Sequence, residues 1–256
     1  MTRPRYPRHS GPLPDALPPA TRTIGQDVAE ALRLYGQRFW LALPLGLVVA
    51  VADQVSQDRS LEARVLVLAA AAPFFALAYT AACALAGGRR PEARPWAAGT
   101  ALGTLAFLPA AFLFPWFALA AVAWLGFAGW VVPAAVLERR APLDAVRRSL
   151  EVARADLVHA LGGLATLALL FGVTRLAMGF VLRSQADNTI RTSVFLADLV
   201  VSPLLYLGAA LVFVDLAARV GSSSRTRRRT DADLPAADHA DREGDADPQL
   251  EPRPPA

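Results

Sequence analysis

The hydrophobic positions of this chain fall into six long apolar segments separated by short charged stretches. Residues 96–137 form 42 consecutive positions without a charge. A buried helix of a soluble domain needs only about 10–14 apolar residues, whereas a bilayer span needs about 20. The pattern therefore predicts membrane-spanning helices rather than a soluble enzyme. The six predicted spans lie at about Phe39–Val55, Val65–Ala86, Ala97–Phe114, Trp116–Leu137, Val158–Leu182 and Val194–Leu216.

The spans differ in length and regularity. The first is the shortest, because only residues 39–52 of it are uncharged. The long uncharged run divides at Pro115, since proline cannot donate to a helix and disfavours helical geometry in the residue before it. Kinked helices can line cavities in transporters, and they also occur in ordinary helix packing. Five of the six spans contain a proline, namely Pro44, Pro73, Pro109, Pro133 and Pro203.

Two charged segments are typical of amphipathic helices at the membrane interface. Thr23 and Gln26 form a capping-box pattern at the start of the first segment, and Pro142 suits the first turn of the second. The charged residues of the first segment, Asp27 among them, fall largely off its apolar face. The apolar faces consist of Ile24, Val28, Ala31, Leu32, Tyr35 and Phe39 in the first segment, and of Leu143, Val146, Leu150, Ala153 and Leu157 in the second.

The predicted fold is an all-α integral membrane protein with about six transmembrane helices, two interfacial helices and disordered tails. Residues 1–22 form a tail rich in proline and arginine, and residues 221–256 form a charged tail. The transmembrane domain occupies residues 23–220 between them. The single cysteine, Cys83, has no partner for a disulfide, which excludes a disulfide-stapled secreted domain.

The basic residues predict the orientation of the spans. All 26 are arginines, and 21 of them belong to the two terminal segments and the loops 87–96 and 138–157. Cytoplasmic loops carry the excess of arginine, so both termini should be cytoplasmic. Arginines at span edges suit anionic lipid headgroups, which makes the bilayer the expected partner. Nucleic acid is not expected as a partner, because no basic face with aromatic readers is evident.

Two stretches resemble bacterial multi-span proteins of the glycerophosphoryl diester phosphodiesterase membrane-domain-like family. They are Ala31–Trp40, with the sequence ALRLYGQRFW, and Pro133–Ser149, with the sequence PAAVLERRAPLDAVRRS. The segment Ser202–Leu216 is also similar to the last span of these proteins. The resemblance implies about six helices in a bacterial plasma membrane. It implies no activity here, because the chain has no room for the family's catalytic barrel of some 250 residues.

Arg175 and Asp198 are the strongest candidates for a functional pair. An arginine at mid-membrane depth costs at least about 2.5–3.5 kcal/mol on insertion scales. The two residues lie at similar depth in the fifth and sixth spans, which a short loop joins. We therefore expect an ion pair between them. It is either a structural pair or a charged site in a polar pocket.

A second candidate group surrounds the end of the fourth span. Glu138 could pair with Arg148 and fix the turn between Pro133 and Pro142. Asp215 and Arg219, four residues apart, suit a pair within one helix. Two of the remaining polar residues carry no expected chemistry. Ser149 lacks an adjacent base, and His159 has no partner at ligand spacing and is interpreted as interfacial packing.

These observations favour a non-enzymatic membrane protein that organises a lipid or assists a protein partner. No catalytic residues, metal site or cofactor are expected. The alternative is a small transporter or permease component that uses Arg175 and Asp198. A membrane-embedded lipid enzyme, with Glu138 as its best candidate acid, comes third.

Overall fold

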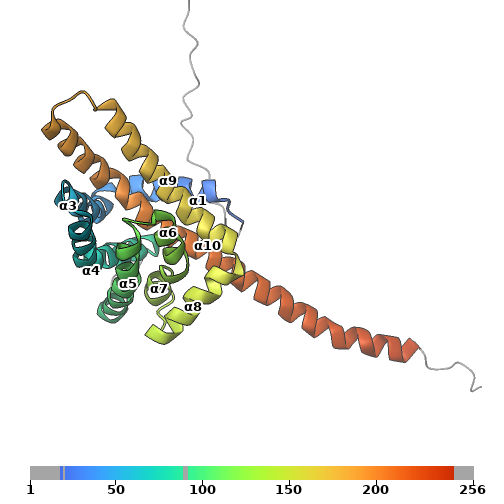
Figure 1. Cartoon of the computed structure of the whole chain (residues 1–256). Coiled ribbons are helices and arrows are strands. Elements are labelled where there is room, and N and C mark those ends of the chain that lie inside the picture. Colours follow the sequence, from blue (N-terminus) through green and yellow to red (C-terminus); the bar gives the residue numbers. More distant parts are fainter. Residues whose placement is uncertain (1–17, 20, 89–91, 245–256) are drawn as a thin grey trace, which may run out of the picture.

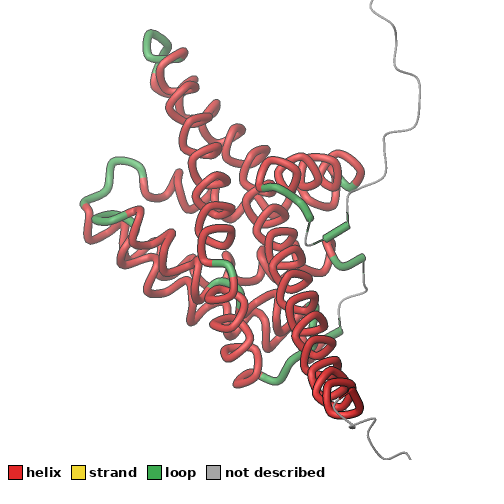
Figure 2. The backbone as a smooth tube through the Cα atoms, turned by 90° about the vertical axis from the view of Figure 1, so that its right-hand side faces the viewer, coloured by secondary structure: helices red, strands yellow, loops and turns green. Residues whose placement is uncertain are grey.

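The computed structural model describes residues 18–19, 21–88 and 92–244, and the regular elements in this part of the chain are all helices (Figures 1 and 2). Among the described residues, six helical stretches are long and apolar enough to cross a membrane, which confirms the predicted all-α membrane fold. These spans are Phe39–Ser56, Leu61–Ala86, Ala93–Leu113, Ala118–Val136, Leu157–Val181 and Asp187–Gly221.

The helices follow the predicted segments closely. The long uncharged run breaks between Leu113 and Ala118, around Pro115, as predicted. The elements are α1 (Ile24–Gln37), α2 (Phe39–Ala42), the 3₁₀ helix η1 (Leu43–Gly46), α3 (Leu47–Ser56), α4 (Leu61–Ala86), α5 (Ala93–Leu113), α6 (Ala118–Ala128), α7 (Val131–Val136), α8 (Pro142–Ala155), α9 (Leu157–Val181) and α10 (Asp187–Gly244).

Polar contacts distinguish the two ends of the bundle. At one end, which we call the terminal end, Arg38 donates to the carbonyl of Leu85, and Arg139 pairs with Glu92 at 2.5 Å. At the other end, the loop end, the Gln54 side chain donates to the Arg191 carbonyl at 2.8 Å. The chain crosses the bundle six times. Because this number is even, the segment before α1 and the last apolar turns of α10 lie at the same end.

The core is built around α10 and the α4–α5 pair. Trp130 and Phe213 are fully buried, with ring centroids 6.4 Å apart. Helix α5 approaches α4 and α7 closely at Gly99 and Gly103. An added Cβ at Gly99 would lie 2.6 Å from Val136 of α7, and one at Gly103 would lie 2.9 Å from Ala76 of α4. These glycines serve helix packing, because small residues let helix backbones come close together.

The first span is not a continuous helix. It consists of α2, η1 and α3, and Pro44 lies in the 3₁₀ turn. Both η1 and α3 contact α10. The closest approach is at Gly46, where an added Cβ would lie 2.1 Å from the Leu199 carbonyl oxygen. Only a residue without a side chain fits against the α10 backbone there.

The two amphipathic helices form where predicted. Helix α8 has the expected outward apolar face, whereas α1 packs differently from the expectation. Leu143 and Val146 of α8 face outward, and Leu143 is 76% exposed, as an interfacial helix requires. In α1, by contrast, the predicted apolar face is partly wrong. Asp27 is only 1% exposed and lies on the buried side with Ala31 and Tyr35, because α1 packs against α9 and α10.

The predicted tails also differ from the structure. Helix α10 continues to Gly244, past residue 221, where a disordered tail is predicted. Extending an existing helix adds one hydrogen bond for each residue fixed, so a packed span can propagate into a polar segment. Arg22, which was assigned to the N-terminal tail, is buried against the bundle. Most of the predicted tail at residues 1–22, and residues 245–256, lie outside the described residues.

We predict that Gly46→Ala destabilises the fold, because its Cβ would clash with the backbone of α10 rather than with a movable side chain. The expected loss is about 1–3 kcal/mol, the usual range for overpacking. Thermal unfolding in detergent measures it. The matched control is Gly172→Ala in α9, where an added Cβ meets nothing within 4 Å. Equal melting temperatures for the two variants would contradict the close approach.

Candidate functional site

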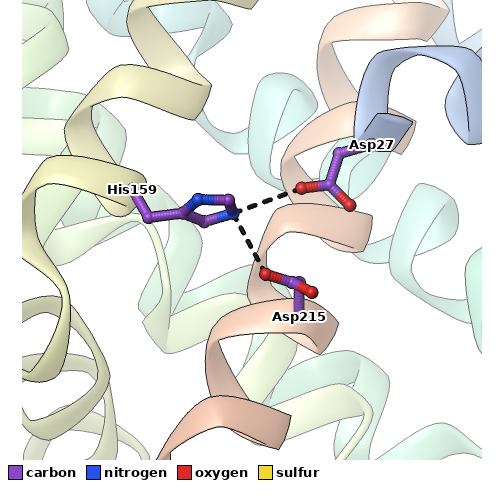
Figure 3. A group of neighbouring side chains, drawn as sticks. All are labelled: Asp27, His159 and Asp215. Carbon is purple, nitrogen blue, oxygen red and sulfur yellow. Dashed lines mark hydrogen bonds and ion pairs between the residues drawn. The ribbon is translucent and has the colours of Figure 1, made fainter. Parts of the chain in front are cut away.

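Three ionisable side chains from three helices meet at the terminal end of the bundle (Figure 3). His159 near the start of α9 lies between Asp27 of α1 and Asp215 of α10. Its Nε2 atom is 3.3 Å from Oδ2 of Asp27 and 3.1 Å from Oδ2 of Asp215. All three residues are buried. We call this group the Asp–His–Asp cluster.

The first turns of α1 and α9 position Asp27 and His159. The Thr23 backbone N–H donates to the Gln26 side chain at 2.8 Å, so the capping box begins α1 and puts Asp27 in its first turn. Asp156 precedes α9, and its carboxylate accepts from the His159 backbone N–H at 3.0 Å. Satisfying an otherwise unpaired N–H group in this way fixes the first turn of α9 and therefore the position of the imidazole.

Arg219 connects the cluster to its surroundings. Its guanidinium donates to Asp215 at 2.7 Å, to Asp156 at 3.2 Å and to the backbone carbonyl of Arg22 at 2.6 Å. The predicted Asp215–Arg219 pair is therefore present, but it is one part of a larger network. A single planar cation with several donors joins α10, the start of α9 and the segment before α1.

The interpretation of His159 as interfacial packing is wrong. Its partners are 132 and 56 positions away in the sequence, so no local spacing could reveal them. One signal was available, since Asp27, Ala31 and Tyr35 recur every fourth residue and therefore share a helical face. An acid on the same face as two apolar residues indicates a buried carboxylate.

The electrostatic environment of Asp27 reflects its burial. Removal from water raises the pKa of this carboxyl above its ordinary value, and the negative charge of Asp215 raises it further. The charges of His159 and Arg22 and the hydrogen bond from His159 act in the opposite direction. The cluster could therefore hold a proton between its acids. Its three potential ligand atoms, which lie within 4.8 Å of one another, could also hold a metal ion.

A second charged group lies toward the loop end, inside the spans. Arg175 of α9 is 2.7 Å from Asp53 of α3, and its Nε atom is 3.5 Å from Oδ1 of Asp198 in α10. The structure thus brings the predicted Arg175–Asp198 pair together and adds Asp53, which sequence reasoning missed. Its signal was an acid directly after the uncharged part of the first span. We call these three residues the intramembrane cluster.

Asp198 is the least satisfied member of the intramembrane cluster. It is 0% exposed, and neither of its carboxylate oxygens has a hydrogen-bond partner among the described residues. Arg175 is close enough for charge attraction but not aligned for a hydrogen bond. Burial of a carboxylate without hydrogen bonds costs several kcal/mol, so Asp198 is an unfavourable position in the fold.

The predicted turn after the fourth span is also present. Glu138 accepts from Arg148 at 3.1 Å and pairs with Arg140 at 2.5 Å, while Pro133 is buried and Pro142 begins α8. The Ser149 hydroxyl donates to the Phe127 carbonyl at 2.5 Å. These contacts give the group a structural role, because Glu138 and Ser149 are engaged in holding the turn and α8.

The fold and the two charged groups define an all-α, multi-pass membrane protein with ionisable side chains buried at both ends of its last helical hairpin. No protein-family model, curated protein or solved structure matches the chain. The resemblance to the phosphodiesterase membrane-domain-like proteins stays a prediction.

We predict that Asp27→Asn becomes progressively more stable than the native protein as the pH rises above about 4. An acid with a raised pKa in the folded state contributes stability below its unfolded pKa, and this contribution is lost as the pH rises through the folded pKa. Asparagine does not titrate, so it does not incur this loss. Melting temperatures between pH 3.5 and 8, measured in detergent with a chelator present, test this directly.

Glu30→Gln is the control, because Glu30 is on the same helix but its side chain is 26% exposed and pairs with Arg33. A stability difference between Asp27→Asn and the native protein that stays constant with pH would show that Asp27 ionises in the folded protein as it does in the unfolded chain.

Proposed function

We propose that this protein is a small membrane transporter or permease component in which the intramembrane cluster binds a proton during transport. Asp198 supports this proposal most strongly, because it is a fully buried acid inside a span and neither of its oxygens has a hydrogen bond within the part of the chain that the structure describes. Ionisable groups inside spans are expensive, and they commonly mark substrate or proton pathways.

The charge of the cluster supports proton binding. One guanidinium lies between two carboxylates, so one negative charge is in excess when all three groups are ionised. A proton on Asp198 would remove that excess and leave Arg175 paired with Asp53. Arg175 is 33% exposed and Asp53 is also partly exposed, so the cluster connects the buried acid to the surface of the bundle.

The broken first span also supports a binding site at this position. Discontinuous helices line the sites of many transporters, since their free backbone groups face the cavity. Here the break at η1 brings Gly46 against the carbonyl of Leu199, the residue directly after Asp198. The irregular backbone and the buried acid therefore occur at the same place in the bundle.

The alternative is a non-enzymatic protein that organises lipid or assists a protein partner. It is favoured by the outward apolar side chains of α8, Leu143, Val146 and Leu150, which suit a membrane surface or a partner helix. A catalytic role is the least supported, because Glu138 holds two arginines and the Ser149 hydroxyl is bonded to a backbone carbonyl.

We propose that the protein lies in a bacterial plasma membrane with both of its termini in the cytoplasm. The terminal end carries most of the arginines, and such an excess is typical of the cytoplasmic side. There, α8 would lie along the headgroups with its apolar residues in the lipid and its arginines toward anionic phosphates.

The test is proton flux in liposomes that contain the purified protein and an internal pH-sensitive dye, driven by an imposed potassium potential. We expect Asp198→Asn to lower the flux at least tenfold while the fold is retained, since asparagine keeps the shape but cannot carry a proton. Asp58→Asn is the control, because Asp58 is an exposed acid that pairs with Arg191 at the loop end.

The double variant Arg175→Gln/Asp198→Asn separates function from structure. We expect it to fold, because the two charges that are removed offset each other and Asp53, which loses Arg175 as its partner, is 22% exposed, and still to lack flux. If the double variant folds and retains the proton flux of the native protein, the Arg175–Asp198 pair has only a structural role. If the native protein carries no flux and instead co-purifies stoichiometrically with a protein in native lipid discs, the accessory function is correct.

A further inference from the structure

The Asp–His–Asp cluster has the donors and the spacing of a metal site, which goes beyond the function proposed for the intramembrane cluster. Its donor atoms are one imidazole nitrogen and two carboxylate oxygens, and they come from three different helices (Figure 3). Both contacts converge on the same atom, Nε2 of His159. That atom carries at most one proton, so it can donate one well-formed hydrogen bond and not two.

The distances suit a shared ion. Two ligands that are each about 2.0–2.1 Å from a tetrahedral zinc ion stand about 3.3–3.4 Å apart. The Nε2 atom of His159 lies 3.3 Å and 3.1 Å from the carboxylate oxygens of Asp27 and Asp215. These two separations match edges of a tetrahedron, and the two carboxylate oxygens lie within 4.8 Å of each other, so binding would draw the carboxylates toward a common ion.

A further observation at Asp27 points to a missing ligand. Its second oxygen, Oδ1, is buried and has no hydrogen-bond partner among the described residues. The whole side chain is almost completely removed from water. The other oxygen, Oδ2, faces His159, and a metal ion bound on that side would offset the charge of this buried carboxylate.

The surroundings hold the ligands in place. Asp156 accepts from the backbone N–H of His159, and Arg219 donates to the Asp215 carboxylate. Hydrogen bonds of this outer kind orient metal ligands and are a regular part of metal sites. Arg219 also offsets part of the negative charge, so that two acids and a neutral imidazole can be buried together.

We propose that Asp27, His159 and Asp215 bind a divalent transition-metal ion of the zinc class. The imidazole nitrogen favours such ions over Mg²⁺ and Ca²⁺, which prefer oxygen ligands only. With three protein ligands, the fourth position remains for water or another small ligand. The ion fastens α1 to α9 and α10 at the terminal end of the bundle.

The test uses the full chain purified in detergent and stripped with a chelator. His9 and His239 are first replaced by alanine, which removes the other two histidines as adventitious ligands. Zinc binding is measured by titration calorimetry, and Co²⁺ is added separately to detect the visible absorption of tetrahedral coordination. We expect one zinc ion per chain and no comparable binding of Mg²⁺.

Two ligand variants, His159→Gln and Asp27→Asn, should each weaken zinc binding at least tenfold. The matched control, Asp53→Asn, alters the intramembrane cluster and should bind zinc as the parent does. This pattern keeps the metal site separate from proton transport, because either cluster can fail without the other. Equal zinc affinity in the parent and in His159→Gln would overturn the site.

A second measurement covers the case in which a ligand variant does not fold. An ion that binds the folded protein alone raises its melting temperature. Zinc should therefore raise the melting temperature of the His9/His239-free parent, whereas Mg²⁺ should not. No shift with zinc, together with no calorimetric binding, would show that the cluster holds only a proton.

Discussion

Ionised side chains buried in a bilayer must be balanced by partners, and this requirement explains how α9 and α10 are held. Each of the two charged clusters contains one residue from α9 and one from α10. Each is completed by a carboxylate from the first part of the chain, Asp27 in one case and Asp53 in the other. The hairpin is thus fastened near both ends to elements that precede α4.

The distance between the clusters follows from helix geometry. His159 and Arg175 are 16 residues apart on α9, which corresponds to about 24 Å along the helix. One cluster therefore lies near the arginine-rich terminal end, and the other lies toward the opposite end of the spans. Because α9 is a continuous helix between them, a displacement of α9 along its axis at one cluster would also move its residue in the other cluster.

The irregular first span is a consequence of the same arrangement. Its carboxylate Asp53 has to reach Arg175, while the 3₁₀ turn at Pro44 brings Gly46 directly against α10. The first span thus contacts the last helical hairpin at two places, through the backbone at Gly46 and through the carboxylate of Asp53.

The six spans, the break at Pro115, the two amphipathic helices and the proximity of Arg175 to Asp198 are all predictable from the sequence. Each of these depends on local hydrophobic length, on proline geometry or on a short connection between neighbouring helices. The folded chain adds the contacts of His159 with Asp27 and Asp215, and of Asp53 with Arg175. Two of these, Asp27–His159 and Asp53–Arg175, join residues more than a hundred positions apart. His159 and Asp215 lie on neighbouring helices, but their apposition depends on how α9 and α10 pack against each other. The spacing of Asp27 in α1 indicates a buried carboxylate, but the partners of a buried charge depend on how whole helices pack, and that packing is not a local property of the sequence.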